Sequence, residues 1–340
     1  MNPELLQVLC CPRCYGAVVD KGECLSCRSC AQEYPLREGI PDMRIYESSA
    51  CASEFNKQQA LYEARLHDEE AQSDYEKHVI GTFGTKTRLM VENWAGEIDK
   101  TSALSVLDYG CGTGQVSRVV APHVKPLFAF DISEKSLRKN VRENGVVGIL
   151  ANSLYLPFPE RAFDIVCING VLHHIVDLDR AIGELARVTA GSVYVSEGIP
   201  RGRPSWGRIR VYPGLQRKVA YACYLVVYWP RALFFMGLRK MRRVAAVLPV
   251  GRNGVSKSHG SQYERPLEVA AVESRMEAHG FKRNRLRYYT NIDIPGDGAL
   301  KRMLTRVLVN DVVGTHFDLA MDKDGHGRVE PDLNPRLPQP

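Results

Sequence analysis

The stretch Val106–Gly114, VLDYGCGTG, decides the fold class of this 340-residue chain. An apolar run reaches Asp108 and is followed by glycines at alternate positions, Gly110, Gly112 and Gly114. Glycine takes a positive φ without strain and lets the backbone approach a ligand closely. Dinucleotide-binding turns have the spacing G-x-G-x-x-G, whereas the spacing here is G-x-G-x-G. It indicates another class of nucleotide-like ligand, although by itself it also fits an ordinary strand-to-helix turn.

Further strand ends follow within the next ninety residues and favour a ligand-binding sheet. Phe128–Ser133, FAFDIS, is a second apolar run that ends at Asp131. A carboxylate at this position can accept hydrogen bonds from both hydroxyls of a ribose. Ala151–Ile175 contains a third strand end and a fourth strand that ends near Asn169. Strands and helices alternating in this order predict a parallel α/β sheet.

With these motifs, the segment from Ala103 to about Pro200 resembles the class I S-adenosylmethionine-dependent methyltransferases, closest to their ubiquinone and menaquinone branch. The resemblance implies a Rossmann-like, seven-stranded α/β sheet with S-adenosylmethionine as cofactor. In this family the glycine turn frames the methionine part of the cofactor. The second acid binds the ribose, and the residues after it and after the third strand form the adenine pocket. The cofactor-binding residues implied here are Asp108, Gly110, Gly112, Gly114, Asp131, Ile132, Asn152, Ser153 and Leu154.

Asn169 matches the family position beside the methyl group, and His173 and His174 stand just beyond the same strand. Gly-Val-Leu follows Asn169, instead of the Pro-Pro-aromatic sequence of adenine and glutamine N-methyltransferases, which argues against a planar amide or amine acceptor. Methyl transfer needs mainly orientation, but an oxygen acceptor must also lose a proton, and histidine suits that task. These three residues are the catalytic candidates; a structural role for the histidines stays open. Asn152 replaces the usual aspartate, which predicts modest cofactor affinity.

The segment before Ile45 contains two C-x-x-C pairs separated by twelve residues. Two such pairs can hold a tetrahedral structural zinc ion between tight turns. Tyr34–Pro41, YPLREGIP, resembles the end of zinc ribbons related to the activator subunit of tRNA and release-factor methyltransferases. An iron–sulfur cluster and disulfides are the alternatives. The predicted zinc ligands are Cys11, Cys14, Cys27 and Cys30, which leaves Cys10 and Cys24 as thiols outside the site.

Between the ribbon and the core, from Tyr46 to Thr101, apolar residues recur at helical spacing among charges. We expect two or three helices that cap the cofactor and acceptor pocket. A solvated helix pair without a role in the site is the alternative. The apolar positions are Phe55, Leu61, Tyr62, Leu66, Tyr75 and Val79.

Between Gly198 and Tyr263 the chain has no Asp or Glu but thirteen Lys or Arg, against a net charge of +6 for the whole chain. Within this segment, Val219–Leu238 is rich in aromatic residues, but its uninterrupted apolar run of about eleven residues is shorter than the ~20 needed to span a bilayer. Basic clusters on both sides favour a helix in the membrane interface over 201–243. A buried insertion with a basic edge and a surface for single-stranded nucleic acid are the alternatives.

The core is expected to resume after this insertion. Leu267–Phe281 predicts an amphipathic helix that ends at Gly280, and Gly298–Gly314 predicts a basic helix. Lys282–Ile292 and Thr315–Lys323 predict the sixth and seventh strands. The expected divisions are a zinc ribbon at 1–45, a helical cap or linker at 46–101, the cofactor half of the core at 102–198, the basic insertion at 199–263, the C-terminal strands at 264–322 and a disordered tail at 323–340.

These observations lead to one expected activity, methyl transfer from S-adenosylmethionine to an oxygen or carbon of a small, amphiphilic or lipid-linked acceptor. The alternatives are an RNA methyltransferase and a non-catalytic adaptor that keeps the cofactor fold. Without a signal segment or a long apolar run, the expected location is the cytoplasm, in peripheral contact with the inner face of the membrane. The acceptor, the accepting atom and the oligomeric state stay open.

Overall fold

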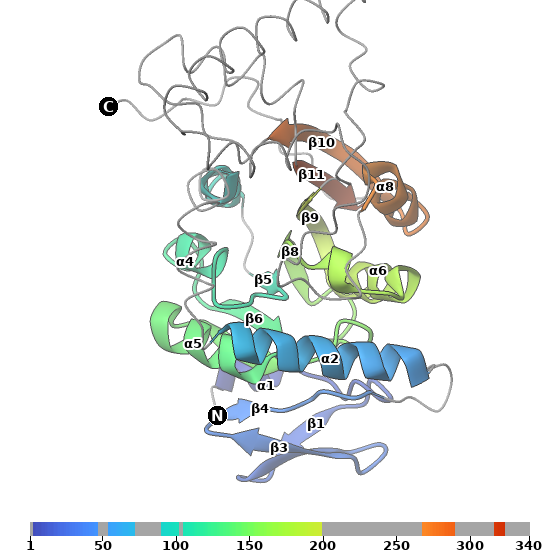
Figure 1. Cartoon of the computed structure of the whole chain (residues 1–340). Coiled ribbons are helices and arrows are strands. Elements are labelled where there is room, and N and C mark those ends of the chain that lie inside the picture. The colour runs from blue at the N-terminus through green and yellow to red at the C-terminus, as the bar shows by residue number, and fades with distance from the viewer. Residues whose placement is uncertain are drawn as a thin grey trace, which may run out of the picture. The chain divides into compact units, whose positions relative to one another are not determined.

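The computed structural model describes residues 3–46, 54–71, 90–101, 105–198, 267–289 and 316–323 (Figure 1). The chain divides into two compact units. The first comprises Met1–Gly198, Tyr263–Arg287 and Phe317–Pro340, and contains nearly all described residues. The second comprises Ile199–Gln262 and Tyr288–His316. The predicted basic insertion, the predicted helix at Gly298–Gly314, Tyr75, Val79 and the tail after Lys323 lie outside the described residues.

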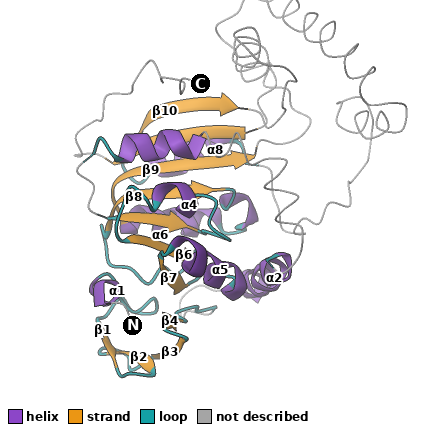
Figure 2. Cartoon of the chain, turned by 90° about the vertical axis from the view of Figure 1, so that its left-hand side faces the viewer, coloured by secondary structure: helices purple, strands orange, loops and turns teal. Residues whose placement is uncertain are grey.

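A seven-stranded sheet forms the centre of the first unit, in the order β10-β11-β9-β8-β5-β6-β7 (Figure 2). The five strands from β9 to β7 in this order are parallel. This confirms the predicted Rossmann-like methyltransferase sheet, in which β11, the last strand of the described residues, lies between β10 and β9. The strands are β5 (Val106–Tyr109), β6 (Leu127–Asp131), β7 (Val147–Leu150), β8 (Phe163–Asn169), β9 (Thr189–Gly198), β10 (Phe281–Tyr289) and β11 (His316–Lys323).

The central strands β5 and β6 are buried along their whole length because helices cover the sheet. Helix α4 packs against α5, and α6 packs against α8. Ser133 caps the start of α5 by accepting the Ser136 N–H, and Gly145 ends it with a left-handed φ of 66°. The predicted amphipathic helix after the insertion is confirmed as α8. The helices are α4 (Ser117–Val120), α5 (Glu134–Asn144), the short 3-10 helix η1 (Leu172–His174), α6 (Leu178–Val188) and α8 (Val269–Glu277).

The N-terminal ribbon is a small antiparallel sheet in the order β1-β2-β3-β4, preceded by a short helix. Its elements are α1 (Pro3–Gln7), β1 (Val18–Asp20), β2 (Cys24–Cys27), β3 (Glu33–Arg37) and β4 (Ile40–Pro41). The chain leaving the ribbon pairs with the edge of the large sheet: Asp42 forms a parallel bridge with Leu150, and the Met43 N–H donates to the Leu150 carbonyl at 2.9 Å. The segment that leaves the ribbon is therefore hydrogen-bonded to edge strand β7.

A second contact fixes the ribbon to α6. The Tyr15 hydroxyl donates to Glu184 Oε1 at 3.0 Å, and the guanidinium of Arg187 lies 4.3 Å from the centre of the Tyr15 ring. Nearby, the Cys10 N–H donates to the Pro157 carbonyl at 2.9 Å. Cys10 precedes and Tyr15 follows the turn from Cys11 to Cys14, so these contacts couple the conformation of this turn to that of the core.

Helix α2 (Glu54–Glu70) occupies part of the predicted helical cap, and residues 90–98 form a second helix. The apolar periodicity does not mark the buried face of α2, because Phe55 and Leu61 are each 46% exposed. The buried face is largely polar, because α2 packs over sheet-end turns that carry polar groups. That face consists of Asn56, Gln59, Ala60, Glu63 and Ala64. Within the described residues, no helix has the length and apolar composition needed to cross a membrane.

Candidate active site

The turn after β5 has three glycines with positive φ, 63° at Gly110, 49° at Gly112 and 97° at Gly114. A Cβ at Gly110 would lie 2.6 Å from a methyl group of Val171, and one at Gly114 would lie 2.4 Å from Asn140 Oδ1. A Cβ at Gly112 would meet no atom within 4 Å. Two glycines thus permit close packing within the protein, whereas Gly112 leaves open space against the backbone. This cradle fits a cofactor that lies on the turn.

Two buried aspartates hold this turn. Asp108 Oδ2 accepts the Ser117 hydroxyl at 2.6 Å, and burial raises the pKa of Asp108 to about 7. Asp131, at the end of β6, accepts the Gly112 N–H at 2.7 Å and the Ser133 N–H at 2.8 Å through different oxygens. Burial also raises its pKa, partly offset by these bonds. A carboxylate has about four acceptor positions, so Asp131 retains capacity for ligand hydroxyls, as its predicted ribose role requires.

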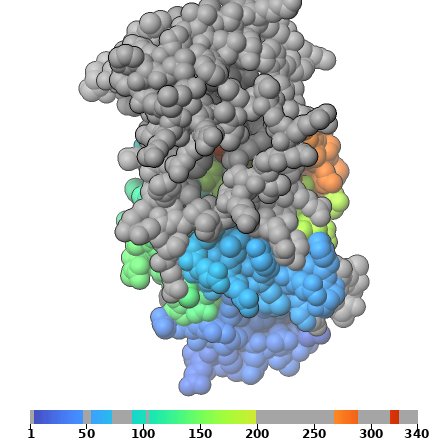
Figure 3. Space-filling model, viewed as in Figure 1, coloured from blue at the N-terminus to red at the C-terminus, as the bar shows by residue number. Residues whose placement is uncertain are grey.

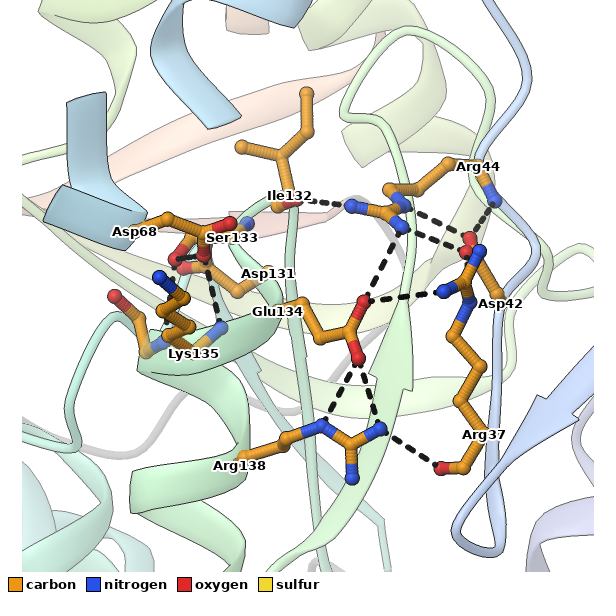
Figure 4. A network of polar contacts seen from close by, with 11 residues as sticks. Arg37, Asp42, Arg44, Asp68, Asp131, Ile132, Ser133, Glu134, Lys135 and Arg138 are labelled. Atoms are coloured by element: carbon orange, nitrogen blue, oxygen red, sulfur yellow. Dashed lines mark hydrogen bonds and ion pairs between the residues drawn. The ribbon is translucent and has the colours of Figure 1, made fainter. Parts of the chain in front are cut away.

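The residues expected around adenine belong to two neighbouring loops that the ribbon's exit segment contacts. Arg44 donates from Nη1 to the Ile132 carbonyl at 3.0 Å, beside the β6 end (Figure 4). Asn152 donates to the Ile45 carbonyl at 3.1 Å, and its Oδ1 accepts the Leu154 N–H at 3.0 Å. Ser153 is half-buried and Leu154 is buried. The internal bonds of Asn152 fix this loop. No motif in the segment around Arg44 marks it as a contact of this loop.

The catalytic candidates cluster after β8. Asn169 donates to Gln115 Oε1 at 3.3 Å, across the mouth of the glycine turn. His173 Nδ1 lies 2.7 Å from Glu197 Oε2, and the other oxygen of Glu197 accepts the N–H groups of Val171 and Leu172 at 2.8 and 2.6 Å. Burial raises the pKa of Glu197, but His173 and these bonds outweigh it and hold that pKa below its ordinary value. Glu197 therefore orients His173. In the sequence, Glu197 is marked only as an acid at the end of the apolar run of β9.

Helix α2 connects the turns after β6 and β8. At one end, Asp68 Oδ1 accepts the Ser133 hydroxyl at 2.7 Å and the Lys135 N–H at 2.9 Å (Figure 4). At the other end, Gln59 donates to the carbonyl of His174, and Asn56 donates to Asp177 Oδ2 at 3.1 Å. In the space-filling view α2 forms a continuous surface layer (Figure 3). The helix thus ties the turn after β6 to the turn after β8.

The four predicted zinc ligands lie together in the ribbon. Cys11 and Cys30 have their sulfurs 3.7 Å apart, Cys14 and Cys27 have theirs 3.5 Å apart, and all four sulfurs lie within 4.8 Å of one another. Zn–S bonds of about 2.3 Å in a tetrahedron place sulfurs about 3.8 Å apart, so the cluster fits one zinc ion.

Local geometry supports this arrangement. The Ser29 N–H donates to Cys27 Sγ at 3.3 Å, and a Cβ at Gly16 would lie 2.3 Å from Ser29 Oγ, so only glycine fits there. All described cysteines are free, so the disulfide alternative is wrong for them. Cys10 is buried and Cys24 is half-buried, both outside the cluster.

Comparison with known proteins agrees with this geometry. Residues 107–195 match the family model described as a methyltransferase domain, and residues 2–39 match that of Trm112p-like proteins. The chain contains a methyltransferase domain that follows a Trm112p-like domain along the sequence. The family match covers the glycine turn, Asp131 and the histidine pair.

Relatives match over this domain. A ubiquinone/menaquinone biosynthesis C-methyltransferase of Vibrio campbellii is 37% identical over 94 residues, which cover 24% of this chain and 36% of the relative. A demethylmenaquinone methyltransferase of Thermobifida fusca is 35% identical over 98 residues, covering 27% and 42%. The mitochondrial arginine-hydroxylase NDUFAF5 of Rattus norvegicus is 37% identical over 81 residues, covering 23% and 24%. The match thus spans less than half the length of each of these relatives.

Solved structures with similar folds are more distant. The Haloferax volcanii complex of the Trm112 methyltransferase activator with a methyltransferase has a TM-score of 0.45 and 12% identity, covering 76% of this chain and 98% of that one. Magnesium protoporphyrin IX methyltransferase from Synechocystis has a TM-score of 0.43 and 16% identity, covering 79% and 95%.

Proposed function

We propose that this protein transfers a methyl group from S-adenosylmethionine to an oxygen or carbon of a small, amphiphilic or lipid-linked acceptor. The observation that carries the proposal is the environment of Gly112. Of the three glycines in the turn, it is the one where a Cβ would meet open space, and its N–H donates to Asp131 at the end of β6. This pairing lies inside the matched methyltransferase domain.

The residues of the two strand ends would hold the cofactor. The backbone from Gly110 to Gly114 would carry its methionine part, Asp131 its ribose, and the loops at Ile132 and Asn152–Leu154 its adenine. Bound S-adenosylmethionine supplies a sulfonium methyl group for in-line displacement. Most of the protein's contribution is then to orient the acceptor against that methyl group.

His173 is the better candidate for removing a proton from an oxygen acceptor. Its Nδ1 lies 2.7 Å from the fully buried carboxylate of Glu197, which orients the ring, and we assign proton removal to Nε2. His174 instead contacts Glu63 of α2. A direct role predicts that His173→Gln lowers kcat by about 10²- to 10⁴-fold with little change in cofactor affinity, and that Glu197→Gln acts in the same direction. A change in cofactor affinity alone would contradict this assignment.

Two features support an amphiphilic acceptor. Two of the relatives named above are enzymes of quinone biosynthesis. In addition, the sequence over 201–243 combines basic clusters with an aromatic, apolar centre, as interfacial segments do. Peripheral contact with a membrane through this segment is part of the proposal. The ribbon would bind one structural zinc ion through its four cysteines.

Calorimetric titration of the zinc-loaded protein with S-adenosylmethionine tests the first step. We expect the wild type to bind and Asp131→Asn to lose about tenfold or more in affinity. The control variant Asp99→Asn, which changes an exposed carboxylate paired with His123, should bind with the affinity of the wild type. Failure of the wild type to bind would revive the adaptor alternative.

Transfer of a labelled methyl group then distinguishes acceptors. Anionic liposomes containing a naphthoquinol, a water-soluble phenol and total RNA would be supplied side by side. Methylation of the liposomal quinol supports the proposal. Methylation of RNA, with binding that falls steeply as salt rises, would replace it with the RNA methyltransferase alternative.

A further inference from the structure

A second group of metal-ligand side chains lies outside the ribbon, where α2 meets η1. It consists of Glu63 and His67 on α2 and His174 on η1. Glu63 Oε2 lies 3.2 Å from His174 Nδ1 and 3.5 Å from His67 Nε2, and the three atoms all lie within 4.8 Å of one another. Glu63 and His67 are one helical turn apart, so both project toward the same side of α2.

The spacing suits a shared ion. Metal bonds of about 2.0–2.2 Å to imidazole nitrogen and carboxylate oxygen place ligand atoms about 3.0–3.6 Å apart in octahedral or tetrahedral sites. The two shorter separations in the cluster fall in this range. His174 Nδ1 is buried and makes no hydrogen bond among the described residues, although Glu63 Oε2 lies 3.2 Å away. A ligand atom in this state is what an ion between the three side chains requires.

The surroundings resemble those of metal-bound histidines. The second ring nitrogen of His67, Nδ1, lies 2.9 Å from Glu70 Oε2. Metal-binding histidines usually donate this other N–H to a carboxylate or carbonyl, which fixes the tautomer. Gln59 holds the backbone of His174 by donating to its carbonyl. Both histidines are therefore positioned by groups that are not themselves in the cluster.

We propose that Glu63, His67 and His174 bind one divalent transition-metal ion at the edge of the acceptor site. Two imidazoles and one carboxylate favour zinc or a first-row metal such as iron or cobalt over magnesium or calcium, which prefer oxygen ligands. Three protein ligands leave at least one position open, as in catalytic metal sites.

The position gives the ion a role. His174 follows the β8 end that carries Asn169, and the carbonyl of His67 accepts the Ser136 hydroxyl at 3.2 Å at the start of α5, shortly after Asp131. The cluster therefore lies between the ends of β6 and β8, which carry the proposed cofactor and acceptor residues. An ion there would bind an acceptor oxygen and favour its deprotonated form. This role rests on the proposed methyl transfer, whereas metal binding itself does not.

An ion-free network is the competing explanation. Burial lowers the pKa of His67, but hydrogen bonds to Glu63 and Glu70 outweigh it and raise that pKa to about 10, while burial lowers the pKa of His174. A charged His67, a carboxylate and a neutral His174 would then only tie α2 to η1. The two explanations differ in metal content, which can be measured without any assay of methyl transfer.

The experiment uses the full chain, stripped with a chelator and reconstituted with Zn²⁺ or Co²⁺. We expect about two ions per chain in the wild type, one on the four cysteines and one on this cluster. X-ray absorption of the wild type should show nitrogen and oxygen ligands in addition to sulfur. His174→Ala and Glu63→Gln should each lose about one ion and keep the thiolate-to-cobalt absorption of the ribbon.

His123→Ala, which removes a histidine that pairs with Asp99 away from the cluster, is the matched control and should keep both ions. Circular dichroism confirms that each variant is folded. One ion per chain in the wild type with sulfur ligands alone would overturn the proposal, as would two ions in folded His174→Ala. Because neither readout involves methyl transfer, a failure here leaves the proposed function standing, and an inactive protein with two ions leaves the metal site standing.

Discussion

Substituting the glycines of the turn one at a time separates packing from ligand binding. Gly110→Ala must adopt a positive φ, at a cost of about 1–2 kcal/mol. It also places a Cβ 2.6 Å from a Val171 methyl group, an overpacking that adds about 1–3 kcal/mol. We therefore expect Gly110→Ala to lower the free energy of unfolding by about 2–5 kcal/mol.

Gly112→Ala should behave differently, because its Cβ meets no protein atom within 4 Å. Its loss of stability should be limited to the backbone term of about 1–2 kcal/mol. The new methyl group would instead occupy space required by the cofactor. A clash of about 1–3 kcal/mol corresponds to a loss of about 5- to 150-fold in affinity for S-adenosylmethionine.

Gly145→Ala provides the matched control, since Gly145 also has a positive φ, 66°, and open space around it, but lies at the end of α5. Urea unfolding measures stability, and calorimetric titration measures cofactor affinity. Gly145→Ala should lose stability like Gly112→Ala and bind the cofactor like the wild type. Equal cofactor affinity of Gly112→Ala and Gly145→Ala would refute the assignment of this turn to the cofactor.

Three further changes test the ribbon and the core. Cys30→Ser should remove about one equivalent of zinc and lower the thermal stability of the ribbon, measured by metal analysis and melting. Asp42→Asn should lose about 2 kcal/mol of unfolding free energy at neutral pH. Burial raises the pKa of Asp42, but Arg44 outweighs burial and holds that pKa below its ordinary value, so the stability advantage of the wild type is complete above about pH 4 and disappears as the pH falls further. Urea unfolding at a series of pH values measures this difference. Trp94→Phe should cost about 1–3 kcal/mol, because it removes the donor that bonds buried Asp318 at 3.0 Å; an unchanged unfolding midpoint would contradict this.

Much of the fold followed from local sequence patterns. Apolar runs, and the glycine or polar residues that end them, predict the strand end at Asp131, the glycine turn and the strands near the C-terminus. The structure contains all of these elements. The paired cysteines also followed from local sequence, because two C-x-x-C turns at this spacing can hold one tetrahedral metal ion. The apolar periodicity of α2 did not locate its buried face, since Phe55 and Leu61 are exposed and largely polar side chains are buried against the protein. Hydrophobic periodicity locates a core-facing helix, not one that covers polar turns.

The sequence by itself determined the α/β sheet, the glycine turn and the cysteine cluster, because each is encoded by residues close together along the chain. Only the tertiary structure decided the partners of those residues. Glu197 meets His173 from the end of another strand, and Glu63 meets His174 from a helix more than a hundred residues earlier. Arg44 reaches the loop after β6 because the ribbon's exit pairs with the sheet edge. Such contacts depend on how distant elements pack, and no spacing along the chain records that packing.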